Sequence, residues 1–175
     1  MIAIVGMPGS GKSEFVNIAI ELGYRFISMG DIVREETVKR GYSLEESGKV
    51  AQILRDEKGL DAIAVLTLDR IREFDDNKFL IEGVRGIKEI ERFRNEIEFF
   101  LIGIHVSPKI RYERLRNRER EDDPKTFEDF QKRDLRELSW GLAEALALSD
   151  VIIDNNGTLE DFRTNIDKVI KKYGL

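Results

Sequence analysis

An apolar run, a glycine-rich turn and a helical pattern follow one another at the start of this chain, and together they restrict its fold more than any other feature. Ile2–Val5 is a continuous apolar run, typical of a strand that is buried on both faces of a sheet. Beyond the turn, apolar residues recur at helical spacing over Lys12–Leu22, and Gly23 ends that pattern. The residues of the turn are Gly6, Met7, Pro8, Gly9, Ser10, Gly11, Lys12 and Ser13.

A turn of this composition between a strand and a helix indicates a phosphate-binding loop. Its glycines let successive backbone N–H groups curl around a phosphate, and the helix N-terminus adds its positive dipole. All residues of the turn are therefore predicted to bind ATP. Lys12 can reach the β- and γ-phosphates, which makes it a predicted catalytic residue, and the Ser13 hydroxyl is a predicted ligand of Mg²⁺.

The rest of the chain alternates between short β-rich runs and longer helical patterns. Further strands are predicted at Arg25–Ser28, Phe79–Glu82, Phe99–Val106 and Val151–Ile153. Helices are predicted from Pro108 to about Arg120, at Thr126–Leu148 and at Leu159–Tyr173, and helix-forming sequence fills Asp31–Phe74 with breaks near Gly41 and Gly59. This order predicts an α/β fold of the three-layer P-loop NTPase kind, a parallel five-stranded sheet with helices on both faces. The 175 residues suit a single domain spanning 1–175.

Composition excludes several classes of site. The chain has no Cys, which removes disulfides and thiolate metal sites, and it has a single His, His105. The net charge of −5 argues against a general nucleic-acid binder, which needs a basic face. The N-terminus has no signal-peptide pattern, and the longest apolar stretch, Phe99–Val106, is far shorter than the ~20 residues that span a bilayer. We expect a cytoplasmic protein without a membrane partner.

A further polar cluster follows the predicted strand at Phe79–Glu82. Glu82 stands at the C-terminal end of that strand, the edge of a parallel sheet where α/β proteins bind ligands. There its carboxylate can hold a water on Mg²⁺, which makes Glu82 a predicted metal-site residue. Gly83 permits close backbone approach, and the Arg85 guanidinium can bind a phosphate through two hydrogen bonds.

A cluster after the second strand carries a family resemblance. Together with the phosphate loop, Ser28 to Arg34 resembles the S-x-G-D-x-x-R segment of adenylate kinases, in the nucleoside monophosphate kinase family. The resemblance implies that Arg34 grips the acceptor phosphate and that Asp31 lies near the metal on the acceptor side. Met29 departs from the hydroxyl-bearing residue that is usual there.

The segment from Glu82 to Arg85 is similar to the D-G-x-P-R segment of the same kinases, with one residue fewer before the Arg. The resemblance implies acceptor-binding roles for Gly83 and Arg85. In the family, a Gln four residues after that Arg reads the adenine of the acceptor, and the corresponding position here is Glu89. A carboxylate only accepts hydrogen bonds, so Glu89 suits the N1–H and amino donors of guanine, and the acceptor base stays open.

Arginines gather in the region of the predicted lid, residues 114–133. Arg114, Arg118, Arg120 and Arg133 resemble the lid and lid-flanking arginines of adenylate kinases. The resemblance implies catalytic contacts that neutralise the migrating phosphoryl group. This lid is short and Cys-free, and a lid that shields the site poorly from water permits residual ATP hydrolysis. Residues 31–74 would be the acceptor-binding helical insertion.

The C-terminal part resembles a second kinase family. Ser149 to Glu160 gives a strand, an Asn/Gly turn and a helix, and it looks like the end of dephospho-CoA kinases. Trp140, inside the predicted long helix, is interpreted as a packing residue, and Asp122 and Asp123 are expected to orient the lid arginines. The chain as a whole resembles an archaeal-type group of adenylate kinase-related proteins.

These features predict a phosphotransferase that uses ATP, with GTP as an alternative donor, and Mg²⁺. Its partner would be a nucleotide-like acceptor. One alternative is a dephospho-CoA kinase, in which a carboxylate such as Asp31 acts as base toward a ribose hydroxyl. Another is a slow ATPase or nucleotide-dependent switch that assists a protein or other macromolecular partner. Nucleic-acid phosphorylation is disfavoured by the net charge.

Overall fold

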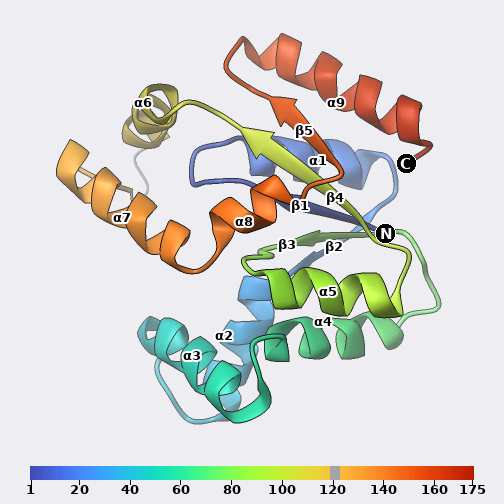
Figure 1. Cartoon of the computed structure of the whole chain (residues 1–175), viewed down its shortest axis with the longest axis vertical. Helices are drawn as coiled ribbons and strands as arrows, with labels where there is room; N and C mark the ends of the chain where they lie inside the picture. Colours follow the sequence, from blue (N-terminus) through green and yellow to red (C-terminus); the bar gives the residue numbers. More distant parts are fainter. Residues whose placement is uncertain (119–122) are drawn as a thin grey trace.

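A single parallel sheet forms the middle of the molecule. In the computed structural model, which describes residues 1–118 and 123–175, this sheet has five strands in the order β2-β3-β1-β4-β5 (Figure 1). The strands are β1 (Ile2–Val5), β2 (Arg25–Ser28), β3 (Phe79–Glu82), β4 (Phe100–His105) and β5 (Val151–Asp154). The four neighbouring strand pairs among the described residues are all parallel, which confirms the predicted α/β fold.

Helices cover both faces of the sheet (Figure 1). They are α1 (Lys12–Glu21), α2 (Met29–Lys39), α3 (Ser47–Lys58), α4 (Ala62–Arg72), α5 (Ile87–Glu96), α6 (Pro108–Arg118), α7 (Phe127–Ser139), α8 (Leu142–Ala147) and α9 (Leu159–Tyr173), with a 3-10 turn at Leu44–Glu46. Side chains alternate across β1, so Ile2 and Ile4 pack with α1 and α9, whereas Ala3 and Val5 pack with α2, α4, α5 and α8. The central strand is buried on both faces because it carries no polar side chain.

One sequence prediction about the helices is wrong, and one helix was missed. The helix predicted over Thr126–Leu148 is wrong as a single element, because it breaks into α7 and α8 at Gly141. Gly141 has a φ of +94°, and a Cβ at this position would lie 2.8 Å from the Arg85 carbonyl oxygen. Helix α5 was not predicted, although Ile90 and Phe93 are buried at helical spacing and the parallel step from β3 to β4 requires a crossover.

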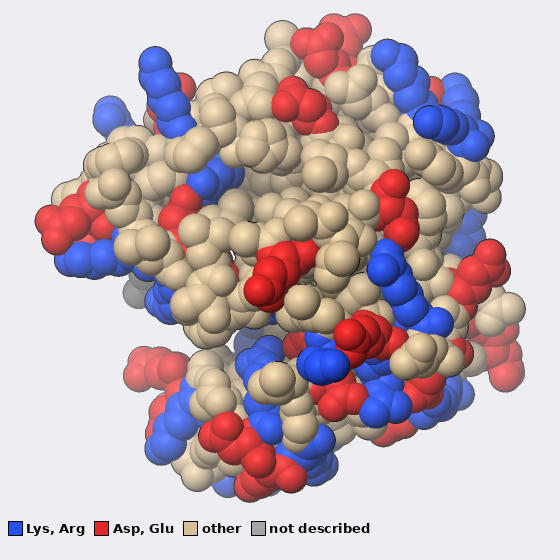
Figure 2. All heavy atoms as spheres, in the orientation of Figure 1, with Lys and Arg blue, Asp and Glu red and all other residues tan. Residues whose placement is uncertain are grey.

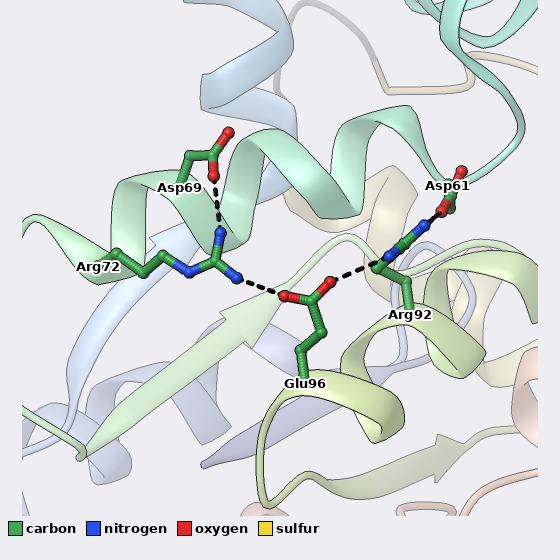
Figure 3. A network of polar contacts seen from close by, with 5 residues as sticks. All are labelled: Asp61, Asp69, Arg72, Arg92 and Glu96. Carbon is green, nitrogen blue, oxygen red and sulfur yellow. Dashed lines mark hydrogen bonds and ion pairs between the residues drawn. The ribbon is translucent and has the colours of Figure 1, made fainter.

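A network of ion pairs joins α4 to α5 on the surface (Figure 3). Arg92 Nε donates to Asp61 at 2.7 Å and Arg92 Nη1 to Glu96 at 3.0 Å, while Arg72 contacts both Glu96 and Asp69. An exposed pair contributes only about 0–1 kcal/mol, but a network holds several side chains in one arrangement. These ion pairs join α4 to α5 at the surface, while the apolar side chains of α4 pack directly against the sheet.

Helix α3 lies farther from the sheet and has a small apolar cluster of its own. Val50 and Leu54 on α3 pack with Ala62 at the start of α4.

In the part of the chain that the structure describes, no helix is both long and apolar enough to cross a membrane.

Candidate active site

The carboxyl ends of β1, β2 and β3 lie together at one edge of the sheet. Glu82 stands beside Ser28 in the register of β2 and β3 and beside Ile4 in that of β1 and β3. The Ser28 hydroxyl accepts a hydrogen bond from the backbone N–H of Asp31 at 3.3 Å and so caps α2. The residue clusters that follow these strands therefore meet at one place, as the parallel topology requires.

The glycine-rich turn joins β1 to α1 at this edge. Gly11, directly before α1, has a φ of +102°, and a Cβ there would lie 2.5 Å from Asn155 Nδ2. That amide donates to the Ser10 carbonyl oxygen at 2.8 Å, so the turn following β5 braces the glycine-rich turn. A side chain at position 11 would break this contact.

Lys12 folds back over the turn. Its Nζ donates to the Gly6 carbonyl oxygen at 2.8 Å and to that of Met7 at 3.4 Å. Burial lowers the pKa of Lys12, while the carboxylates of Glu82 and Glu137 act in the opposite direction. The ammonium group is thus held by backbone carbonyls, contacts that a phosphate can replace.

Two arginines of helix α6 connect it to the turn, one directly and one through Asn155. The buried Arg111 donates to the Pro8 carbonyl oxygen at 3.3 Å and to Asp134 Oδ1 on α7 at 2.8 Å. Arg114 donates to the Asn155 carbonyl oxygen at 3.0 Å. Arg111 was not predicted as a site residue. The sequence did offer one indication, because Arg111 stands between Ile110 and Tyr112 on an otherwise polar helix. Through it, the turn, α6 and α7 form one connected support.

A first cavity of about 620 Å³ opens over the turn. It brings together these predicted site residues: Gly6, Pro8, Gly9, Ser10, Gly11, Lys12, Ser13, Arg34, Glu82, Gly83, Arg85, Arg114, Arg118 and Arg133. The Met7 side chain packs against the core instead, and Arg120 lies outside the described residues. Basic groups outnumber acidic ones in this lining even though the whole chain is acidic. The first cavity therefore suits a polyanion.

Asp123 lies between two of the arginines of the predicted lid. Arg118 Nε donates to Asp123 Oδ2 at 2.9 Å, and Arg133 Nη1 lies 3.7 Å from Asp123 Oδ1. This contact agrees with the expectation that Asp123 orients the arginines; Asp122 lies outside the described residues.

A second cavity of about 250 Å³ adjoins the first. The two share a wall, which we define as Gly30, Arg34, Gly83, Arg85 and Glu137. Beyond that wall the second cavity is lined by α3, by the start of α5 and by the C-terminal end of α7. Figure 2 shows a notch in the molecular outline on the side where α7 faces α2 and α3.

Trp140, interpreted from the sequence as a packing residue, lies at the surface of the second cavity and not in the core. Its side chain lines the cavity and the residue is 40% exposed. The guanidinium carbon of Arg85 lies 4.7 Å from the ring centroid, and that of Arg136 lies 5.5 Å from it. Arg85 also donates to Glu137 at 3.0 Å across the wall. Trp140 and Glu137 thus hold Arg85 between the two cavities.

Glu89 lies in the second cavity with its carboxylate already engaged. One oxygen accepts from the backbone N–H of Arg85 at 2.8 Å and the other from Arg55 on α3 at 3.2 Å. Glu89 is 2% exposed, and burial raises its pKa while these two contacts act against that effect. Its carboxylate therefore orders the loop before α5 and orients Arg55. Asp31, outside both cavities, accepts from Arg34 Nε at 3.1 Å.

The residues present fit a magnesium ion that is held largely by nucleotide phosphates. Ser13 and Glu82 both line the first cavity, but no group of three or more His, Asp or Glu in the described residues could hold a metal by itself. Mg²⁺ keeps several waters and usually binds through one or two protein oxygens together with substrate phosphates. A lone hydroxyl and a lone carboxylate suit that mode.

Comparisons with known proteins identify the family. A family model described as AAA domain matches residues 5–131. A UPF0200 protein of Methanosarcina barkeri is 44% identical over 177 residues, covering 99% of this chain and 95% of the relative. The chain belongs to the UPF0200 family. A relative from Pyrococcus horikoshii is 42% identical over 179 residues, with 98% and 96% covered.

One relative is longer than this chain. The UPF0200/UPF0201 protein of Archaeoglobus fulgidus is 42% identical over 178 residues, which cover 98% of this chain but 55% of the relative.

Solved structures show the P-loop kinase fold. Shikimate kinase from Bacteroides thetaiotaomicron aligns with a TM-score of 0.63 at 16% identity, covering 99% of this chain and 98% of that one. Shikimate kinase from Acinetobacter baumannii in complex with shikimate aligns with a TM-score of 0.61 at 14% identity, with 98% and 91% covered. At these identities the likeness concerns the fold alone.

Proposed function

We propose that this UPF0200 protein is an ATP- and Mg²⁺-dependent kinase of the nucleoside monophosphate kinase type, acting on an anionic, nucleotide-like acceptor. The observation that carries the proposal is the shared wall between the two cavities. A phosphate donor on the glycine-rich turn and an acceptor in the second cavity would meet at Arg34 and Arg85. Such end-to-end placement is what phosphoryl transfer requires, because its catalysis consists mainly of positioning and charge neutralisation.

The donor side uses the turn. Backbone N–H groups of residues 6–13 and the Lys12 ammonium bind the phosphates of ATP or GTP, and Ser13 and Glu82 hold Mg²⁺ and its waters. When bound there, Mg²⁺ would supply positive charge that neutralises the phosphates of the donor. During transfer, a bond forms between an acceptor oxygen and the γ-phosphorus, while the bond to the β–γ bridging oxygen breaks and leaves the nucleoside diphosphate.

The acceptor side uses residues 31–74 together with the loop after β3. Arg34 and Arg85 bind the accepting phosphate, Gly83 lets it approach the backbone, and Asp31 orients Arg34. A phosphate acceptor is already anionic, so it needs no strong general base. The hypothesis that Glu89 reads a guanine edge stays a prediction, with Arg55 beside it as a hydrogen-bond donor.

Residues 114–133 act as the lid in this proposal. Arg114, Arg118, Arg120 and Arg133 neutralise the transferring phosphoryl group, with Asp123 aligning Arg118 and Arg133. Because the lid is short, some hydrolysis of ATP by water accompanies transfer.

A second candidate, a nucleotide-dependent switch or slow ATPase that assists a protein partner, is favoured by one observation. The Archaeoglobus fulgidus relative continues well beyond the matching region and carries a double family name, so the P-loop part is joined to further sequence there. In this candidate the second cavity binds a ligand that is not phosphorylated.

Acceptor-dependent turnover separates the two candidates. Nucleoside diphosphate release from Mg·ATP and from Mg·GTP would be measured with and without AMP, GMP, CMP, UMP, dephospho-CoA and a hydroxyl acceptor such as shikimate, with Lys12→Ala as the blank. The kinase proposal predicts that one acceptor raises release by orders of magnitude and is itself phosphorylated. Slow release that is indifferent to every acceptor contradicts it and favours the switch.

A further inference from the structure

The second cavity has more positive charge than its carboxylates balance. Among the described residues that line it, four arginines stand against two glutamates: Arg34, Arg55, Arg85 and Arg136 against Glu89 and Glu137. A cavity with this excess binds anions. The accepting group at the shared wall would use Arg34 and Arg85, which leaves Arg55 and Arg136, lining the second cavity alone, without a role in the proposed function.

The four arginines of the second cavity differ in how they are held. Arg34 is paired with Asp31 outside the lining, Arg55 with the buried Glu89, and Arg85 with Glu137. Arg136 has no carboxylate within ion-pair distance in the part of the chain that the structure describes, and its recorded side-chain contact is with the Trp140 ring. An arginine held over an aromatic face keeps its N–H donors available and loses little further freedom when it binds an anion.

The floor of the second cavity is apolar. Met29 and Val33 on α2 and Ile63 on α4 are buried beneath it, and the exposed face of Trp140 stands at its side. A ligand lying here meets apolar surface, the arginines of the shared wall, and Arg55 and Arg136, which line the second cavity but not the first. Guanidinium groups only donate hydrogen bonds, so the group that meets Arg55 and Arg136 must be rich in acceptors.

From this arrangement we propose that the acceptor is a two-ended anion, with one anionic group at the shared wall and a second, a carboxylate or phosphate, bound by Arg136 and Arg55. The inference rests on the proposed function in placing the accepting group at the wall. Arg136 is in this account a specificity-determining residue, because it favours acceptors that carry the second charge.

Trp140 provides a direct readout, because it is the single Trp of the chain and lines the second cavity. Its fluorescence would be followed while the protein, in the absence of ATP and GTP, is titrated with two matched pairs of probes. One pair is glycerol 3-phosphate and 3-phosphoglycerate, and the other is AMP and adenosine 3′,5′-bisphosphate. Within each pair the second member adds one anionic group, a carboxylate in the first pair and a phosphate in the second.

In at least one pair, the two-ended probe is expected to bind about tenfold more tightly, the scale of one charge-assisted contact. Arg136→Gln is expected to reduce that preference to about twofold or less. The control is Arg116→Gln, which removes an exposed arginine of α6 that lines neither cavity, and it should keep the full preference. Which pair responds tells whether the far group is a carboxylate or a phosphate.

The proposal is overturned if neither pair shows a preference, including the case in which no probe binds, or if Arg136→Gln keeps the preference unchanged. Because the titration contains no ATP and measures no transfer, its outcome is independent of whether the protein proves to be a kinase. A failed turnover assay with a retained preference would remove the proposed function and leave the two-ended site.

Discussion

The two cavities share a wall but are built by different means. The first is centred on one continuous turn, which contributes seven of its lining residues, Lys12 among them. The second is formed by side chains from α2, α3, α5 and α7, among them Arg55, Glu89 and Trp140, which lie far apart in the sequence. The phosphate-binding turn is thus contiguous in the sequence, whereas the second cavity is assembled by tertiary packing of distant segments.

The charged side chains that line the two cavities have two kinds of partner. Lys12 is held by backbone carbonyls, which a ligand phosphate can outcompete without leaving a carboxylate unpaired. Arg55 and Arg85 are held by Glu89 and Glu137, so their geometry is fixed before any ligand arrives. A ligand phosphate can therefore replace the contacts of Lys12, whereas Arg55 and the shared-wall Arg85 keep carboxylate partners.

The largest effect is expected from Lys12→Ala, which removes a charged group from the first cavity and leaves the lining of the second unchanged. Phosphoryl transfer should fall by about three orders of magnitude, because charge neutralisation of the transferring group is lost. Stability should not fall, since burial lowers the pKa of Lys12 and the variant removes a buried charge. Steady-state turnover and urea unfolding would check both parts. Transfer within about tenfold of the wild-type rate would contradict the role of Lys12.

A second large effect is expected from Arg111→Leu, which removes the support behind the turn. Arg111 is buried and binds Asp134 and the Pro8 carbonyl, so its loss leaves a carboxylate unpaired. The free energy of unfolding should drop by about 3–5 kcal/mol, measured by urea denaturation. The matched control, Arg163→Leu, breaks an exposed pair with Glu14 and should cost no more than about 1 kcal/mol. Equal losses in both variants would contradict the bracing role.

A smaller effect, which tests the shared wall itself, is expected from Glu137→Gln. Since Glu137 lines both cavities, removing its charge should tighten binding of ATP and of adenosine 3′,5′-bisphosphate alike, by about threefold to tenfold at low salt. Equilibrium titration of each ligand gives the comparison. A change for one ligand and none for the other would show that the wall is not shared.

The smallest effect concerns pH and Glu89. Because burial raises its pKa in the folded protein, protonated Glu89 contributes stability below the unfolded-state value, and that contribution is lost as pH rises through the folded pKa. Glu89→Gln has no such titration and keeps an oxygen for the Arg85 N–H. From pH 4.5 upward, wild-type stability should therefore fall relative to the variant in urea denaturation. If the wild type instead became more stable relative to the variant as pH rises over this range, the prediction would be contradicted.

The sequence predicted the first cavity better than the second for a physical reason. Strand periodicity, the turn and the parallel order follow from neighbouring residues, and they place Lys12, Ser13 and Glu82 at one edge. Arg136 and Trp140 carry no local pattern that distinguishes them from surface or packing residues. Their position depends on the break at Gly141, where α7 ends against the Arg85 carbonyl, a contact that no sequence window contains.

The destination of the γ-phosphoryl group tests most directly whether phosphoryl passes from a donor in the first cavity to an acceptor in the second. Phosphorus NMR of a single turnover, with protein in excess over Mg·ATP and the acceptor found in the turnover assay, follows that group. If phosphoryl passes across the shared wall, the phosphorylated acceptor should form in the same amount as ADP, apart from a small fraction of inorganic phosphate. If the γ-phosphoryl appears as inorganic phosphate whatever acceptor is present, the two cavities do not form a kinase site.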